Sequence, residues 1–312
     1  MTTLNLGILD LVPVQAGVSA EQAVQQAAEL AVKGEEWGYQ RYWTSEHHDL
    51  ESLGSASPEV LLAHIGARTS RIMLGSGAVL LPHYSPLKVA EWFHLLSALY
   101  PGRVELGLGR APGGKAHASM ALSGNFLQHV AEFPQSLRAV MELLEGTYTY
   151  EDVPVHATPS PRTPPVPWLL GTNVKSAAYA AEFGTGYVFG HFMSETDGAE
   201  AVHQYRGQFQ PSSMMEEPRV IVAAALYCAR TEAEAKETAA RAAASMNADP
   251  QGQGPEGYPV SWIVGNAEQA AEQLNVLAGQ FKTDELLIVT TPFDHKERLQ
   301  SYRLLAQTLI GK

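Results

Sequence analysis

The sequence predicts an α/β fold of the TIM-barrel type, with eight parallel strands that alternate with helices. Two observations support this prediction. Short apolar segments alternate with amphipathic ones along almost all of the 312 residues, and eight strand-then-helix units can be counted. A doubly wound sheet is the second choice for the same alternation. We expect residues 1–312 to form one domain, because the alternation resumes directly after the proline-rich stretch 159–167.

The elements follow from local signals. We expect the strands at residues 4–9, 40–44, 71–76, 103–108, 166–170, 186–190, 218–229 and 284–289. We expect the helices at residues 18–37, 58–69, 86–99, 116–145, 174–183, 196–209, 232–245, 267–279 and 296–309. Ser19 is a suitable N-cap for the first helix, and Pro58 suits the first turn of the second. Pro134 is expected to break the long fourth helix, and residues 148–156 alternate like a small hairpin insertion.

Composition excludes several classes of function. The formal net charge of −12 argues against nucleic-acid binding, because no basic stripe offsets the phosphate field. The single cysteine, Cys228, allows no intramolecular disulfide and fits a cytoplasmic protein. Neither a signal peptide nor an apolar stretch of transmembrane length is visible, so no membrane association is expected.

Active sites of such barrels lie on the loops that follow the strands, and Glu46-His47-His48 directly follows the second predicted strand. A catalytic or substrate-facing histidine suits this place, because imidazole exchanges protons near neutral pH. Structural histidines are the main alternative. A metal site is disfavoured, because adjacent side chains on an extended segment point apart and no helical two-histidine spacing is present.

Glycine-rich strand ends mark further candidates. Residues 107–114 end the fourth strand without the third glycine of a dinucleotide fingerprint, and Arg110 there could pair with a phosphate or simply be solvated. Residues 171–176 open a helix whose first N–H groups suit an anion, although Thr172 or Asn173 could be a plain N-cap. The small residues 75–78 leave room for a flat ring, or else allow close packing of a helix on the strand.

Three ordered segments, residues 43–48, 70–86 and 101–113, together with 168–173 and 284–289, resemble the bacterial luciferase-like flavin monooxygenase family, specifically its short single-chain branch. The resemblance covers nearly the whole chain. It implies a TIM barrel with FMN at the C-terminal mouth. A non-prolyl cis peptide is implied at Gly77-Ala78, beneath the flavin ring.

The resemblance also implies roles for individual residues. Arg110 is similar to the phosphate-binding arginine of the family, and His47 to its catalytic histidine, with Glu46 and His48 as neighbours. Further residues match the phosphate cradle, namely Thr172, Asn173 and Ser176. Two positions depart from the luciferase pattern: Gly109 stands where luciferase has its reactive cysteine, and Thr172 where it has a phosphate-site glutamate.

We therefore expect an oxidoreductase in which reduced FMN and O2 oxygenate a small organic substrate, a reaction on paired donors. His47 would be the acid or base, and Glu46, His48, His83 and His191 would line the substrate pocket. A separate NAD(P)H flavin reductase could supply reduced FMN, and the chain is expected to form a homodimer through helices 58–69 and 86–99. The alternatives are hydride transfer with a deazaflavin or FMN, a non-catalytic flavin-binding protein, and, on a different chemistry, a divalent-metal hydrolase.

Overall fold

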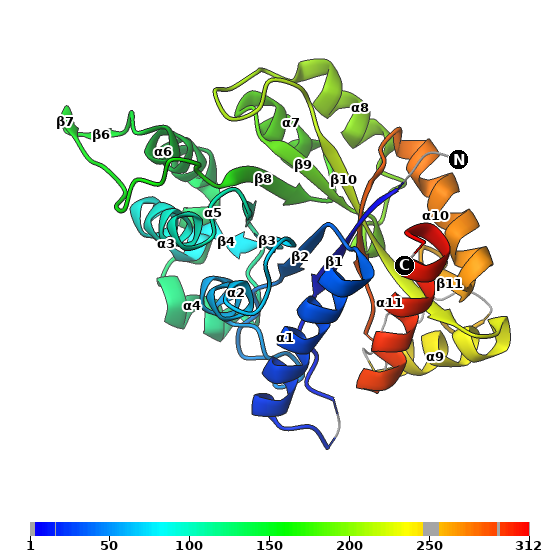
Figure 1. Cartoon of the computed structure of the whole chain (residues 1–312). Coiled ribbons are helices and arrows are strands. Elements are labelled where there is room, and N and C mark those ends of the chain that lie inside the picture. The colour runs from blue at the N-terminus through cyan, green and yellow to red at the C-terminus, as the bar shows by residue number, and fades with distance from the viewer. Residues whose placement is uncertain (1–3, 16, 246–255, 292–293, 312) are drawn as a thin grey trace.

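Eight parallel strands form a closed barrel in the computed structural model, which describes residues 4–15, 17–245, 256–291 and 294–311 (Figure 1). The strands, in their order around the barrel, are β1 (Asn5–Asp10), β2 (Arg41–Thr44), β3 (Met73–Ser76), β5 (Val104–Gly109), β8 (Val166–Gly171), β9 (Gly186–Gly190), β10 (Val220–Ala229) and β12 (Glu285–Val289). The barrel closes because β1 pairs with both β2 and β12, while β9 pairs with both β8 and β10. The TIM barrel is therefore confirmed, and the doubly wound sheet is excluded.

Helices surround the barrel, as Figure 1 shows. They are α1 (Ala20–Trp37), α2 (Pro58–Gly66), α3 (Pro86–Leu99), α4 (Ala116–Ser123), α5 (Phe126–Ala131), α6 (Phe133–Glu145), α7 (Val174–Glu182), α8 (Ala199–Gln208), α9 (Glu232–Ser245), α10 (Ala267–Phe281) and α11 (His295–Leu309). The expected N-cap is present: Ser19 accepts a hydrogen bond from the backbone N–H of Gln22, whose side chain bonds back. Each of these helices in the described ranges is too short or too polar to cross a bilayer.

Shorter elements decorate the barrel. The predicted hairpin is confirmed as β6 (Thr149–Tyr150) and β7 (Val153–Pro154), which projects from the body of the molecule (Figure 1). β4 (Val79–Leu80) pairs with the end of β5 and continues into the 3-10 helix η1 (Leu81–His83). The strand β11 (Ile263–Asn266), which pairs with the far end of β10, was not predicted.

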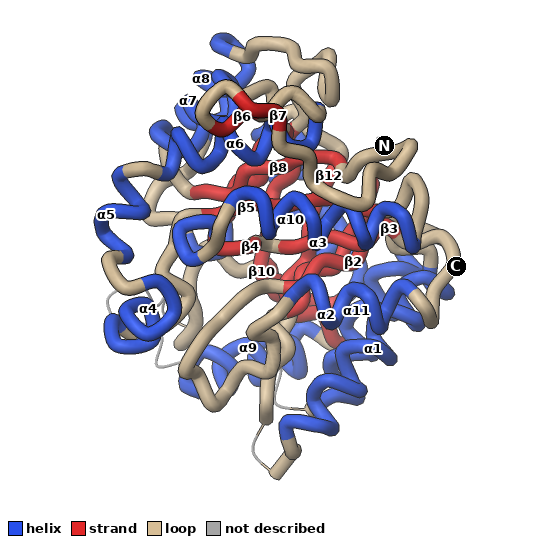
Figure 2. Tube along the Cα trace, turned by 90° about the vertical axis from the view of Figure 1, so that its left-hand side faces the viewer, coloured by secondary structure: helices blue, strands red, loops and turns tan. Residues whose placement is uncertain are grey.

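The predicted helix at 116–145 is three helices rather than one broken at Pro134 (Figure 2). The breaks lie at Gly124-Asn125, where the glycine has a positive φ of 72°, and at Glu132. Pro134 instead sits in the first turn of α6, where its missing N–H costs no helical hydrogen bond. Residues 247–259, which are rich in Gly, Gln and Pro and are therefore expected to form a loop, lie mostly outside the described residues.

The side chains of the strands divide into two layers. Tyr42 and Tyr187 point outward into the core between barrel and helices. Trp43, Trp168 and Val188 belong to a separate cluster that fills the barrel interior. The two tryptophan rings meet edge to face at 6.0 Å. Successive side chains of a strand thus point alternately to the barrel interior and to the surrounding helices, as expected for a barrel strand that is packed on both faces.

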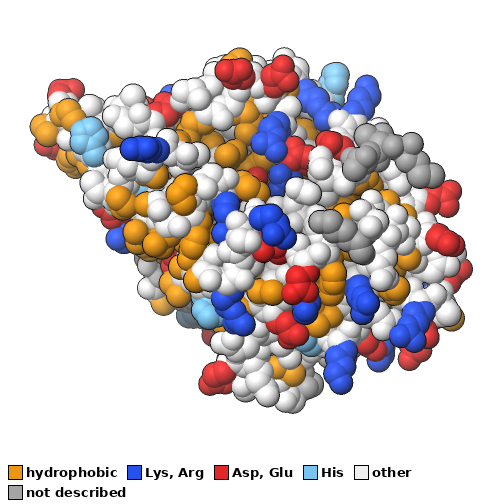
Figure 3. All heavy atoms as spheres, in the orientation of Figure 1, with side chains coloured by type: hydrophobic (Ala, Val, Ile, Leu, Met, Phe, Trp, Pro, Cys, Tyr) orange, Lys and Arg blue, Asp and Glu red, His pale blue; other side chains and the backbone are white. Residues whose placement is uncertain are grey.

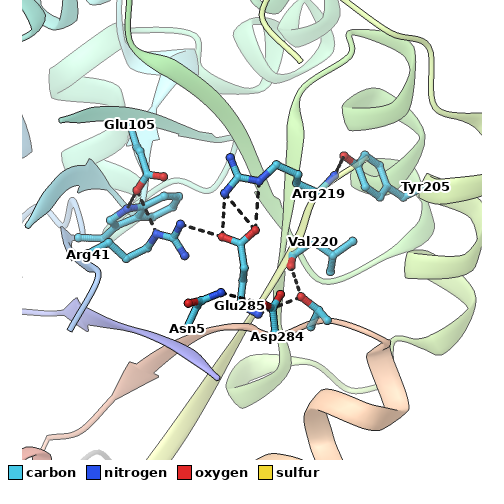
Figure 4. Close-up of polar contacts among 10 residues, drawn as sticks. Asn5, Arg41, Glu105, Tyr205, Arg219, Val220, Asp284 and Glu285 are labelled. Atoms are coloured by element: carbon cyan, nitrogen blue, oxygen red, sulfur yellow. Dashed lines mark hydrogen bonds and ion pairs between the residues drawn. The ribbon is translucent and has the colours of Figure 1, made fainter. Parts of the chain in front are cut away.

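A chain of ion pairs closes the N-terminal end of the barrel (Figure 4). Arg41 bridges Glu105 at 3.2 Å and Glu285 at 2.7 Å, and Arg219 also binds Glu285, at 2.9 Å. The indole N–H of Trp43 donates to the same Glu105 oxygen at 2.7 Å. Burial alone would raise the pKa of Glu285, but Arg219 and Arg41 outweigh it and lower that pKa. Arg41, Glu105, Glu285 and Arg219 thus form a plug of paired charges at this end of the barrel.

The plug predicts a large loss of stability in the variant Glu105→Gln. The change leaves the buried Arg41 short of one carboxylate, and breaking a buried pair typically costs about 3 kcal/mol or more. Urea denaturation should show that loss. The matched control is Glu182→Gln, since Glu182 pairs with Arg138 on the surface and such exposed pairs contribute at most about 1 kcal/mol. Equal losses in the two variants would contradict this role of the plug.

Candidate active site

The buried carboxylate of Glu46 organises the C-terminal end of the barrel. One of its oxygens accepts hydrogen bonds from His48 Nε2 at 2.7 Å and from the Tyr84 hydroxyl at 2.8 Å. The other accepts from the backbone N–H of Leu80 at 3.0 Å. Burial, followed by the charge of Glu46, raises the pKa of Tyr84, so this phenol stays protonated and donates. Glu46 thus joins the loop after β2 to the segment β4–η1.

His47 is held differently from its neighbour. Its Nδ1 lies 3.0 Å from Ser45 Oγ, and its backbone N–H donates to the carbonyl of Ser55. Its Nε2 forms no hydrogen bond with any described residue. Burial lowers the pKa of His47, with His48 adding to the effect and Glu46 opposing it, so the imidazole is mostly neutral at pH 7. His47 therefore combines a fixed orientation with an available nitrogen.

His83 lies beside this cluster but is already fully engaged. Its Nδ1 lies 3.0 Å from Ser123 Oγ, and its Nε2 lies 3.0 Å from the carbonyl of Pro112. Its ring stacks on Phe126 and meets His48 edge-on at 5.9 Å. These contacts tie the loop after β5 and the helices α4 and α5 to the mouth of the barrel.

The peptide bond between Gly77 and Ala78 is cis, as the family resemblance implies. It follows β3, whose last residue, Ser76, bonds both backbone groups of Gly107 through its hydroxyl. A Cβ at Gly107 would stand 2.0 Å from the Ser76 carbonyl oxygen, so only glycine allows β3 and β5 to approach this closely. The two predicted glycine-rich strand ends are thus locked together.

Arg110 and the start of α7 lie at the ends of neighbouring strands. β5 pairs with β8 up to Leu108 and Leu169, which brings the residues that follow to the same edge. Arg110 is half-buried and makes no hydrogen bond or ion pair within the described part of the chain. Asn173 and Ser176 form a capping box, and Ser176 Oγ also lies 3.2 Å from the Tyr187 hydroxyl. The plain N-cap interpretation is thus confirmed for Asn173. Its side chain accepts from the N–H of Ser176, which does not prevent other N–H groups at the start of α7 from binding an anion.

The structure gives Thr172 and His191 contacts outside the Glu46 cluster. The carbonyl of Thr172 accepts a hydrogen bond from Ser194. His191 follows β9, but its ring contacts Phe189 and Phe281, which belong to the core between barrel and helices. His191 lies in the 3-10 helix η2 (His191–Met193) that follows β9, and there its ring packs on this core rather than joining the Glu46 cluster.

Two features of this end were not predicted from the sequence. Asp10, the last residue of β1, forms a buried ion pair with Arg298 of α11 at 2.5 Å and accepts from the Tyr42 hydroxyl at 2.7 Å. Tyr227 of β10 stacks on Trp262 at 4.7 Å. A polar residue that ends a buried strand was the available signal for Asp10. Its partner, 288 positions away, carried none.

The possible metal donors Glu46, His47 and His48 have separate hydrogen-bond partners. The described ranges contain no group of three or more His, Cys, Asp or Glu side chains placed to hold a metal ion. Glu46 and His48 bond to each other, and His47 is turned to Ser45. The donors of the triplet are thus committed to different partners.

Comparisons with known proteins agree along the whole chain. The family model described as luciferase-like monooxygenase matches residues 4–308. A Bacillus subtilis (strain 168) protein, named only as uncharacterized protein YwcH, is 40% identical over 97% of this chain and 98% of its own length. The N-acetyl-S-alkylcysteine monooxygenase of that strain is 32% identical over 99% of each chain. The solved structure of apo-MsnO8, 33% identical, covers 98% of each chain with a TM-score of 0.88.

More distant solved structures share the fold alone. The oxygenating constituent of 3,6-diketocamphane monooxygenase from Pseudomonas putida, a type II Baeyer–Villiger monooxygenase solved in complex with FMN, is 20% identical. It covers 100% of this chain and 99% of its own, with a TM-score of 0.73. An F420-dependent secondary alcohol dehydrogenase in complex with an F420–acetone adduct is 15% identical over 98% of each chain, with a TM-score of 0.71. The same fold therefore serves two cofactor classes.

Proposed function

Because this chain belongs to the luciferase-like monooxygenase family, as the match over residues 4–308 shows, we propose that it is an FMN-dependent monooxygenase. The observation that carries the proposal is the arrangement at the barrel mouth. A neutral histidine with a free Nε2, a cis Gly77-Ala78 peptide and an uncommitted arginine stand at the ends of β2, β3 and β5. Family members with named reactions include the Bacillus subtilis monooxygenase above.

The residues at the mouth fit FMN. The guanidinium of Arg110 has no partner within the described part of the chain, and a phosphate would supply one. The N–H groups at the start of α7, with Thr172, Asn173 and Ser176 around them, favour the same anion. Gly109 keeps the space beside Ala78 open, because a Cβ there would stand 3.1 Å from the Ala78 Cβ. Gly77 and Ala78 would then contact the flavin ring.

His47 would be the residue that donates or accepts the proton during the oxygenation of the substrate. When Ser45 Oγ donates to Nδ1, Nε2 carries a proton and can donate it; in the other tautomer, Nε2 accepts one. Its lowered pKa keeps the neutral ring available at pH 7 for either role. Bound reduced FMN would supply the oxygen chemistry, activating O2 toward an organic substrate. Glu46 positions the mouth through Tyr84 and His48, and a flavin reductase would be the partner that supplies reduced FMN.

The second candidate function is hydride transfer with a deazaflavin, because an F420-dependent enzyme shares this fold. Incorporation of 18O from labelled O2 into product separates the two functions, since hydride transfer needs no oxygen. N-Acetyl-S-alkylcysteines are the first compounds to test, given the 32% identical relative that is named for them.

His47→Ala should bind FMN within about threefold of wild type but lose turnover by about 100-fold or more, the usual contribution of an acid–base residue. The readout is 18O incorporation with a substrate that the wild type accepts. The matched control is His117→Ala, which removes an exposed histidine from α4. Unchanged turnover in His47→Ala would show that another group handles the proton.

We also propose a homodimer that forms through α2 and α3. Val60 is 65% exposed on α2, and Leu95 and Leu99 are 51% and 54% exposed one turn apart on α3. Such exposed apolar side chains on two packed helices suit an interface between copies.

The double variant Leu95→Glu/Leu99→Glu should sediment near the chain mass of 33.7 kDa, whereas the wild type should sediment at about twice that mass. Leu127→Glu is the control, because Leu127 is 78% exposed on α5 rather than on α2 or α3. A wild type that sediments as a monomer at micromolar concentration would refute the dimer.

A further inference from the structure

A groove of about 820 Å³ runs along the outside of the helix ring, beside α1 and α11. Figure 2 shows these two helices side by side, and Figure 3 shows Lys and Arg side chains over them. The lining residues are Lys33, Glu36, Trp37, Arg230, Lys296, Leu299, Gln300, Arg303, Leu304 and Gln307. The groove has no part in the site at the barrel mouth.

The charge of this groove is opposite to that of the chain. Its lining has four cations and one carboxylate, Glu36, which Lys33 already binds at 2.7 Å. The side chains of Arg230, Lys296 and Arg303 form no hydrogen bond or ion pair with a described residue, although the backbone N–H of Lys296 donates to the N-cap Asp294. The whole chain carries 33 acidic and 21 basic side chains, so three uncompensated cations in one groove stand out. They favour an anion there.

The spacing along α11 suggests the shape of that anion. Residues 296, 300, 303 and 307 recur at helical spacing and form one stripe. Lys296 and Arg303 are seven residues apart, so their Cα atoms are separated by about 10 Å along the helix. Leu299, Leu304 and the half-buried Trp37 add apolar surface beside the charges. The groove thus offers separate contacts for charge and for a flat apolar group.

We propose that this groove binds a small phosphate-bearing molecule of the nucleoside diphosphate class. Arg230, Lys296 and Arg303 would hold the phosphates, because both side-chain types bind phosphate oxygens well. Trp37 would pack against the base, and Gln300 can donate and accept hydrogen bonds between the two. The volume lies within the range of ordinary ligand pockets.

Calorimetric titration with ADP at 50 mM salt tests this proposal. Wild type should show saturable binding that weakens as salt rises, because exposed charges are screened. The charge-reversal variant Lys296→Glu/Arg303→Glu should bind ADP at least tenfold more weakly. Arg162→Glu is the matched control: it reverses an exposed arginine in the loop before β8 and should bind ADP like wild type.

Two further titrations separate this groove from the barrel mouth and from other ligands. Arg110→Ala should bind ADP with the affinity of wild type, whether or not it loses affinity for FMN. The ADP titration can therefore be interpreted even if the flavin proposal fails. Pyrophosphate should bind more weakly than ADP, because it lacks the base. The proposal is overturned by equal ADP affinity in wild type and the charge-reversal variant, by loss of ADP binding in Arg110→Ala, or by tighter binding of a poly-glutamate peptide than of ADP.

Discussion

The arrangement of the barrel mouth depends on one buried carboxylate, that of Glu46. It accepts hydrogen bonds from His48 in its own loop, and from Tyr84 and the backbone of Leu80 in the segment β4–η1. A buried carboxylate that lacked such donors would be strongly destabilising, so the loop after β2 and the segment β4–η1 must come together for it to be tolerated. Glu46 binds Nε2 of His48, whereas Nε2 of the adjacent His47 forms no hydrogen bond within the described ranges.

The two ends of the barrel carry different kinds of residues. At the N-terminal end, Arg41, Glu105 and Glu285 form paired charges, and both carboxylates bind Arg41. At the C-terminal end, Gly77, Gly107 and Gly109 keep the backbone close-packed or open where side chains would fill the space. In this fold, stability typically resides at the N-terminal end and catalysis at the C-terminal end, and the two sets of residues fit that division.

The barrel could be predicted from the sequence because each strand and helix has its own local pattern, and eight strand-then-helix units follow one another along the chain. Local signals failed where several overlapped: residues 116–145 form three helices, and Gly124 outweighs Pro134 as a break. The position of site residues at strand ends was predictable, but their direction was not, so His191 turned out to face Phe281. The pairing of Asp10 with Arg298 joins distant segments and has no local signature.

The claim that FMN sits at this mouth with its phosphate on Arg110 is tested most directly by comparing FMN with riboflavin, which lacks the phosphate. Fluorescence titration of wild type should show FMN bound at least tenfold more tightly than riboflavin, as expected for a charge-assisted phosphate contact. Arg110→Ala should lose that preference while its riboflavin affinity stays unchanged. Equal affinities of wild type for the two flavins, or binding of F420 without binding of FMN, would contradict the claim.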